Sequence, residues 1–104
     1  MLHNCPSHLS VGSRGLWATL TASFEFEAHE VELLRLALEA LDRAAQARRA
    51  LRRDGVFVLD RFDQLRPHPA VDIEAKSRRA YAALMAQLDL PEAEAPAPAR
   101  LRSA

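Results

Sequence analysis

The stretch from Ala28 to Arg53 contains neither glycine nor proline and consists mainly of Leu, Ala, Glu, Arg and Gln. Because these residue types favour the helical backbone, the stretch predicts one long helix. Gly55 follows as a C-terminal stop, and the acidic FEFEAHE segment at the other end suits the positive N-terminus of a helix. A helix gains most of its stability by packing an apolar face, so the faces of this helix constrain the rest of the fold.

Two apolar faces run along the predicted helix. The first is lined by Leu33, Leu36, Ala37, Ala44, Ala47 and Leu51, and the second, about 100° away, by Leu34, Leu38 and Leu41. One face can pack on the protein's own core, and the other then needs another helix or another subunit. We expect the second face, with Leu34, Leu38 and Leu41, to join subunits of an oligomer.

Shorter patterns predict the other elements. An apolar stripe anchored by Trp17 predicts a short helix from Ser13 to Phe24. After Gly55, β-prone residues, a polar segment and two prolines predict a small hairpin, and Pro69 is placed to begin a third helix that ends near Leu88. The predicted core consists of Trp17, Leu33, Leu36, Leu51, Ile73 and Leu84.

The predicted fold is therefore mainly α, with a short N-terminal helix, a long central helix, a small β-hairpin and a third helix. Residues 13–90 form its single oligomer-forming domain, preceded by a flexible lead-in, residues 1–12, and followed by a disordered Pro/Ala-rich tail, residues 91–104. A chain of 104 residues builds a modest core, so association between subunits is expected to add stability. The single cysteine and the lack of a signal peptide or long apolar run favour a cytoplasmic protein without membrane contact.

Basic residues are concentrated in the middle of the chain. The 14 basic and 14 acidic residues cancel, but residues 41–80 hold ten basic against six acidic residues. The RRALRR run places guanidinium groups one helical turn apart, where they can contact neighbouring phosphates, although such runs are also typical of a solvated helix end. The candidate DNA contacts are Arg48, Arg49, Arg52 and Arg53 and, where the hairpin and third helix fold back beside them, Arg61, Arg66, Lys76, Arg78 and Arg79.

The sequence does not indicate an enzyme, a metal site or a cofactor. His3, Cys5 and His8 lie in the predicted flexible lead-in, which offers no rigid frame for a zinc ion. With three glycines the chain has no glycine-rich phosphate loop, and it contains no GxSxG or HExxH pattern. His68, in the PHPA segment, is interpreted as a structural or surface residue, because Pro67 ends the hairpin and Pro69 begins the helix.

Several segments occur in a recognisable order between about Ser13 and Leu90: GLW, HEVELLRLALEALDRAAQARRAL, Gly55, and DRFDQLRPHPA before a helix ending LMAQLDL. This order resembles the P27-like family of bacteriophage terminase small subunits. The resemblance implies a ring-forming homo-oligomer that binds double-stranded phage DNA in the bacterial host and hands it to the large terminase subunit. The family often has glycine at the position of Asp63, and aspartate tolerates the left-handed backbone that such a turn requires.

Two other functions stay open. One is a helical protein-interaction module without a nucleic-acid role, in which the arginines are simply solvated. The other is a small phage DNA-binding regulator, which needs polar side chains that read base edges. The long helix offers no Asn or Gln beyond Gln46 for this purpose, so the regulator ranks last.

Overall fold

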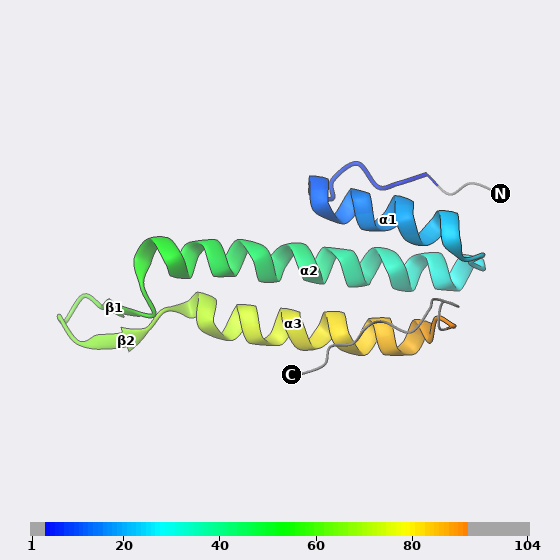
Figure 1. Ribbon diagram of the computed structural model, residues 1–104. Coiled ribbons are helices and arrows are strands. Elements are labelled where there is room, and N and C mark those ends of the chain that lie inside the picture. Colours follow the sequence, from blue (N-terminus) through cyan, green and yellow to red (C-terminus); the bar gives the residue numbers. More distant parts are fainter. Residues whose placement is uncertain (1–3, 92–104) are drawn as a thin grey trace, which may run out of the picture.

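The computed structural model describes residues 4–91, which form a mainly helical structure with one small hairpin (Figure 1). The elements in chain order are α1 (Val11–Ser23), α2 (Ala28–Asp54), β1 (Phe57–Leu59), β2 (Leu65–Pro67) and α3 (Pro69–Leu88). The predicted order of elements is confirmed, with the first helix beginning two residues earlier than expected and the third matching its predicted bounds.

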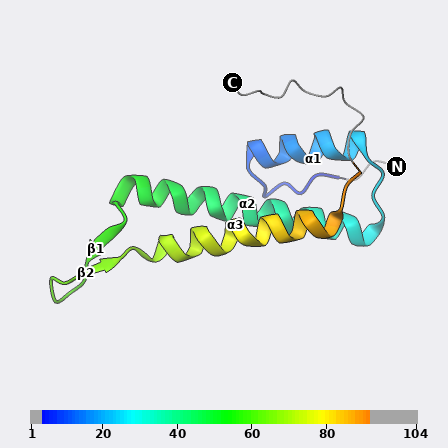
Figure 2. The same ribbon diagram turned by 60° about the horizontal axis from the view of Figure 1, so that its bottom comes forward.

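The two long helices lie side by side in opposite directions, and α1 covers only one half of α2 (Figures 1 and 2). The hairpin extends from the opposite end, beyond the last turn of α2 and the first turn of α3. We call residues 4–42 and 77–91 the packed end, and residues 43–76 the arm. The packed end has three helical layers, whereas the arm has two helices and a two-stranded ribbon.

Local sequence signals fix the helix ends. The Ser10 side chain caps α1 by accepting a hydrogen bond from the Ser13 amide. A capping box formed by Glu27 and Glu30 begins α2, and each of the two carboxylates accepts a hydrogen bond from the other residue's backbone amide. At its other end α2 stops at Gly55, whose φ of 86° is strained for residues with a side chain.

The main core lies at the packed end, between all three helices. Its buried members are Leu9, Trp17, Phe26, Leu34, Leu38 and Leu88. The prediction that Leu34, Leu38 and Leu41 join subunits is wrong, since Leu34 and Leu38 are 0% exposed and Leu41 packs against the same core. The second apolar face of α2 does need another element, and α1 supplies it from within the chain.

The predicted core residues are divided by this arrangement. Trp17 is buried as expected, and Leu33, Leu51 and Leu84 are half-buried. The core assignment is wrong for Leu36, 41% exposed, and for Ile73, 49% exposed. Leu36 therefore contributes little to the contacts of α2 with α1 and α3, and Ile73 lies on the arm, where no third helix is present.

Small residues line the contact between α2 and α3 along the arm and at its junction with the packed end. Ala40, Ala44 and Ala47 follow one another at helical spacing on α2 and are almost completely buried, as are Ala70 and Ser77 on α3. Such short side chains let two helix backbones approach closely but bury little apolar area. The arm is therefore held together with much less apolar burial than the packed end.

The N-terminal segment is part of the fold, contrary to the flexible lead-in expected for residues 1–12. Leu9 is 3% exposed in the core, and α1 already begins at Val11. Residues 1–3, with the metal candidate His3, and residues 92–104 of the predicted tail lie outside the described part of the chain. Within residues 4–91 no helix combines the length and apolarity needed to cross a membrane.

Candidate assembly and nucleic-acid interface

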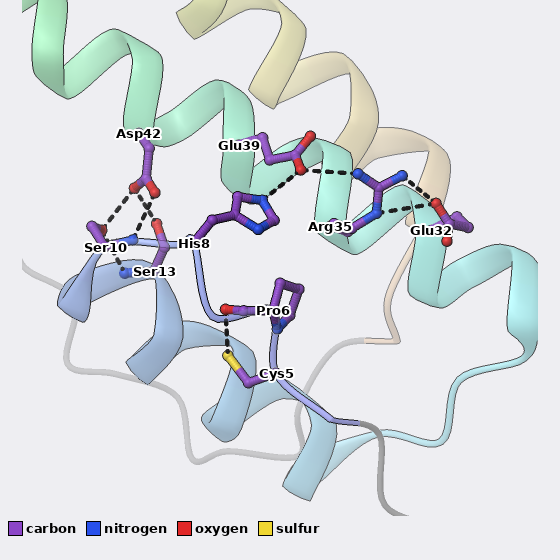
Figure 3. Close-up of polar contacts among 9 residues, drawn as sticks. All are labelled: Cys5, Pro6, His8, Ser10, Ser13, Glu32, Arg35, Glu39 and Asp42. Carbon is purple, nitrogen blue, oxygen red and sulfur yellow. Dashed lines mark hydrogen bonds and ion pairs between the residues drawn. The ribbon is translucent and has the colours of Figure 1, made fainter.

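A polar cluster fastens the N-terminal segment to the middle of α2 (Figure 3). Asp42 accepts three hydrogen bonds, from the Ser10 amide at 2.8 Å, the Ser10 hydroxyl at 2.7 Å and the Ser13 hydroxyl at 2.6 Å. Burial raises the pKa of Asp42, but the hydrogen bonds from Ser13 and Ser10 outweigh it and hold the pKa below its ordinary value. The cluster thus stabilises the start of α1 against α2.

Beside it, His8 and Arg35 both contact Glu39. His8 Nε2 lies 2.7 Å and Arg35 Nη1 2.9 Å from Glu39 Oε2, and Arg35 also pairs with Glu32 (Figure 3). Burial raises the pKa of Glu39, and the hydrogen bonds from His8 and Arg35 lower it further than burial raises it. The contact of His8 with Glu39 holds the segment before α1 against α2, as the hydrogen bonds to Asp42 do.

This cluster lacks the geometry of a nucleophilic site. The hydroxyls of Ser10 and Ser13 both donate to Asp42, and His8 contacts Glu39 instead of either hydroxyl. Cys5 Sγ lies 3.6 Å from the carbonyl oxygen of Pro6, to which it donates a hydrogen bond (Figure 3). Among residues 4–91, no group of three His, Cys, Asp or Glu side chains is arranged to hold a metal ion. We therefore interpret the cluster as a structural fastening.

Two of the predicted DNA contacts converge on a single carboxylate. Arg48 of α2 lies 3.0 Å and Arg78 of α3 3.3 Å from Glu74 Oε2. The hydrogen bonds from Arg78 and Arg48 hold the pKa of Glu74 below its ordinary value, although burial acts in the opposite direction. Glu74 thereby neutralises part of the charge that these arginines offer to an anion.

Three more predicted contacts are also ion-paired. Arg53 pairs with Asp54 at 2.8 Å, Arg66 with Asp60 at 2.9 Å and Lys76 with Asp72 at 3.0 Å. The predicted contacts that form no ion pair within residues 4–91 are Arg49, Arg52, Arg61 and Arg79. Of these, Arg61 stacks over the Phe62 ring, with its guanidinium carbon 5.2 Å from the ring centroid.

The nine predicted contacts are spread over α2, the ribbon and α3. Arg48, Arg49 and Arg52 lie on the arm half of α2, while Arg61 and Arg66 lie on the ribbon beyond the helix end. Arg49 and Arg52 continue the side of α2 that carries Leu34 and Leu38 at the packed end. This side changes from leucine to arginine where the cover from α1 ends, which leaves both guanidinium groups exposed.

The ribbon carries an exposed apolar face that sequence reasoning did not assign to a function. Phe57 pairs with Pro67 and Leu59 with Leu65, so these side chains share one face of the ribbon. Phe57 is 58%, Leu59 62% and Leu65 65% exposed, and Phe62 in the turn is 68% exposed. The signal was the alternation of Phe57 and Leu59 in a hairpin that no helix between residues 4 and 91 covers.

His68 fixes the base of the ribbon to both long helices. Its Nδ1 accepts a hydrogen bond from the Ala70 amide at 2.9 Å, which leaves Nε2 as the protonated nitrogen, 2.9 Å from Asp54 Oδ2. Its own amide donates to the carbonyl of Val56 at 2.7 Å. Arg53, and then His68, hold the pKa of Asp54 far below its ordinary value. His68 therefore has a structural role, as expected. Its contacts fix the direction in which the ribbon leaves the two helices.

An open groove of about 360 Å³ lies between α2 and α3 on the arm. Its lining residues are Arg43, Gln46, Ala47, Ala50, His68, Pro69, Ala70 and Ile73. The alanines make the groove, because their short side chains leave space that larger residues would fill. Most of the lining is apolar, and Arg43 contributes a positive charge to it.

The chain matches no protein-family model, and it matches neither a curated protein sequence nor a solved structure.

Proposed function

We propose that the protein is a non-enzymatic assembly adaptor of the terminase small-subunit type, which self-associates, binds double-stranded phage DNA in the host cytoplasm and delivers it to the large subunit. The observation that carries the proposal is the exposed apolar face of the ribbon. A two-stranded hairpin by itself is only marginally stable in water, so a face this apolar is expected to be covered by another molecule.

Assembly through the ribbon replaces the leucine interface that the sequence suggested. The ribbon stands clear of the helices, and its apolar residues are accessible without any rearrangement of the packed end. Aromatic and large aliphatic side chains of this kind form the centres of protein interfaces. The role of the core leucines is then to hold α1, α2 and α3 together within each subunit.

Arg49 and Arg52 are the best candidates for phosphate contacts. Both are exposed, neither is ion-paired within residues 4–91, and they stand about one turn apart on α2. Arg48 and Arg78 share Glu74, so a phosphate has to compete with an existing carboxylate for them. Contacts of this kind neutralise the backbone of DNA without reading its sequence.

A salt titration of duplex-DNA binding tests this assignment. Log affinity falls with log salt concentration by about 0.9 per phosphate contact, so Arg49→Ala with Arg52→Ala makes this negative slope shallower by about 1.8. The matched control combines Arg66→Ala with Lys76→Ala, which removes two ion-paired cations and leaves the slope nearly unchanged. An unaltered slope in the Arg49/Arg52 variant would remove these residues from the DNA interface.

Light scattering of the whole chain tests self-association. The proposal expects particles heavier than the 11.6 kDa chain at micromolar concentrations. A strict monomer over the whole range contradicts the assembly role.

A protein-interaction module without DNA binding is the second candidate, favoured by the five predicted DNA contacts that are ion-paired within the chain. It predicts an assembled protein that duplex DNA does not retain even at low salt. The adaptor predicts retention that fades as salt is added, so the same two measurements separate the candidates.

A further inference from the structure

We propose that the ribbon of one copy inserts into the arm groove of a second copy, with Phe62 in the groove and Asp63 facing Arg43. This inference rests on the self-association in the proposed function and specifies the surfaces that meet. Both halves of the contact are present on every chain, the apolar ribbon as a protrusion and the groove between α2 and α3 as its receptor.

Size and chemistry of the groove fit the tip of the ribbon. A cavity of ~150 Å³ is enough to enclose a benzene ring. The groove, at about 360 Å³, therefore has room for the Phe62 ring and a neighbouring aliphatic side chain such as Leu65. Its walls include Ala47, Ala50 and the half-exposed Ile73, which are apolar surfaces that gain by being covered.

The charges at the two surfaces are complementary. Arg43, which lines the groove, is exposed and forms no ion pair within residues 4–91. Asp63, next to Phe62 in the turn, is likewise exposed and unpaired, and its φ of 60° belongs to the tight turn at the tip. When Phe62 enters the groove, the negative Asp63 carboxylate beside it faces the positive Arg43 guanidinium of the second copy.

The groove of the same chain is out of reach for its own ribbon. The hydrogen bonds of His68 to Asp54, Ala70 and Val56 hold the base of the ribbon at the helix ends. From there the ribbon extends away from the helices (Figures 1 and 2), while the groove lies alongside them. The ribbon that enters the groove therefore comes from a second copy of the chain.

The contact joins two different surfaces of the same subunit. If two copies exchange ribbons reciprocally, the assembly closes as a dimer, and if each ribbon enters the next copy, it closes as a ring. Asp63 pairs with Arg43 in the dimer and in the ring, so substitutions of these two residues test the contact whatever the number of subunits.

Charge reversal tests the pairing by light scattering. Arg43→Asp and Asp63→Arg each place like charges at the contact and are expected to yield the 11.6 kDa monomer, whereas the double variant restores the wild-type mass. Restoration also excludes backbone strain at position 63 as the cause of the loss. Phe62→Asp is expected to give the monomer as well, and Val11→Asp, a change at a 78% exposed residue of α1, keeps the wild-type mass.

Disulfide cross-linking tests the proximity independently, in a Cys5→Ser background. Gln64→Cys on the ribbon turn is mixed with Gln46→Cys at the groove, and a mixed disulfide is expected on oxidation. Gln87→Cys, exposed on α3 at the packed end, is the matched partner that should not cross-link.

The two levels of proposal fail in different ways. A wild-type protein that assembles, but whose charge variants keep their mass and whose cysteines do not cross-link, overturns the ribbon-in-groove contact and leaves the adaptor function standing. A strictly monomeric wild-type protein overturns both.

Discussion

The packed end and the arm share the two long helices α2 and α3, yet they differ in what holds these helices together. At the packed end, leucine, tryptophan and phenylalanine side chains fill the space between three helices. Along the arm, alanines bring α2 and α3 together, and the largest apolar side chains of the ribbon face outward. Stability is thus concentrated at one end, and the surfaces offered to other molecules at the other.

The largest expected effect tests the packed end. Leu38 is 0% exposed, so Leu38→Ala leaves a cavity and is expected to lower the free energy of unfolding by about 3 kcal/mol. Leu36→Ala removes the same atoms at a 41% exposed position two residues earlier and should cost less than about 1 kcal/mol. Urea unfolding followed by circular dichroism gives both values, at one protein concentration because assembly also contributes to stability.

Equal losses in the two leucine variants would break the comparison, because they would place Leu36 in a buried interface of its own. A loss of assembly without a loss of stability in Leu38→Ala would restore the subunit-joining role that the sequence suggested for the second face of α2.

The next effect concerns the fastening of α1. In Asp42→Asn an amide replaces the carboxylate that accepts hydrogen bonds from Ser10 and Ser13, and we expect a loss of about 2 kcal/mol. The control is Asp72→Asn, which breaks a pair with Lys76 that is 68% and 70% exposed and should cost less than about 0.5 kcal/mol. If both cost the same, the Asp42 cluster does not anchor the N-terminal segment.

The carboxylates of Asp42 and Glu39 make the stability of the protein depend on pH. Because the pKa values of Asp42 and Glu39 are lowered by folding, the unfolded chain binds more protons than the folded one at low pH. Their contribution is fully present above the ordinary carboxyl range and is lost as the pH falls below about 4. The Asp42→Asn variant should therefore lose less stability than wild type between neutral and acid pH, by up to about 2 kcal/mol in urea titrations.

Other carboxylates keep the stability of the Asp42→Asn variant dependent on pH. Folding also lowers the pKa values of Asp54, Asp60 and Glu74 on the arm. A profile for Asp42→Asn that runs parallel to the wild type would mean that Asp42 ionises alike in the folded and unfolded chain.

Most of the fold follows from patterns that extend over neighbouring residues. The helix from Ala28, its stop at Gly55 and the start of α3 at Pro69 depend on local propensities and caps, and the structure has them where the sequence predicted them. The assignment of faces failed because it depends on what lies across from each side chain. Leu34 and Leu38 share one buried core with Trp17 of α1, an element whose docking site on α2 no local pattern specifies.

The interface was harder to predict for a related reason. Whether an arginine such as Arg48 is free depends on Glu74, which is distant in sequence and comes within reach only when α2 and α3 pack in one register. The apolar face of the ribbon was visible as an alternation in the sequence. Its exposure was not, because exposure is a property of the elements that fail to cover it.

The smallest expected effects compare one chemical change, glycine to alanine, at two positions. The change is expected to lower stability at the end of α2 and to raise it inside α1. Gly55→Ala places a side chain at a φ of 86° and should lower stability by about 1 kcal/mol or more, loosening the ribbon base. Gly15→Ala, in the interior of α1, should raise stability by about 0.5–1 kcal/mol, because no atom outside the adjacent helix backbone and the two neighbouring residues lies within 4 Å of the added carbon. Amide hydrogen exchange locates the difference, because Gly55→Ala should speed exchange in the ribbon before the packed end is affected. Uniformly faster exchange over all three helices would show that the ribbon and the packed end unfold as one unit.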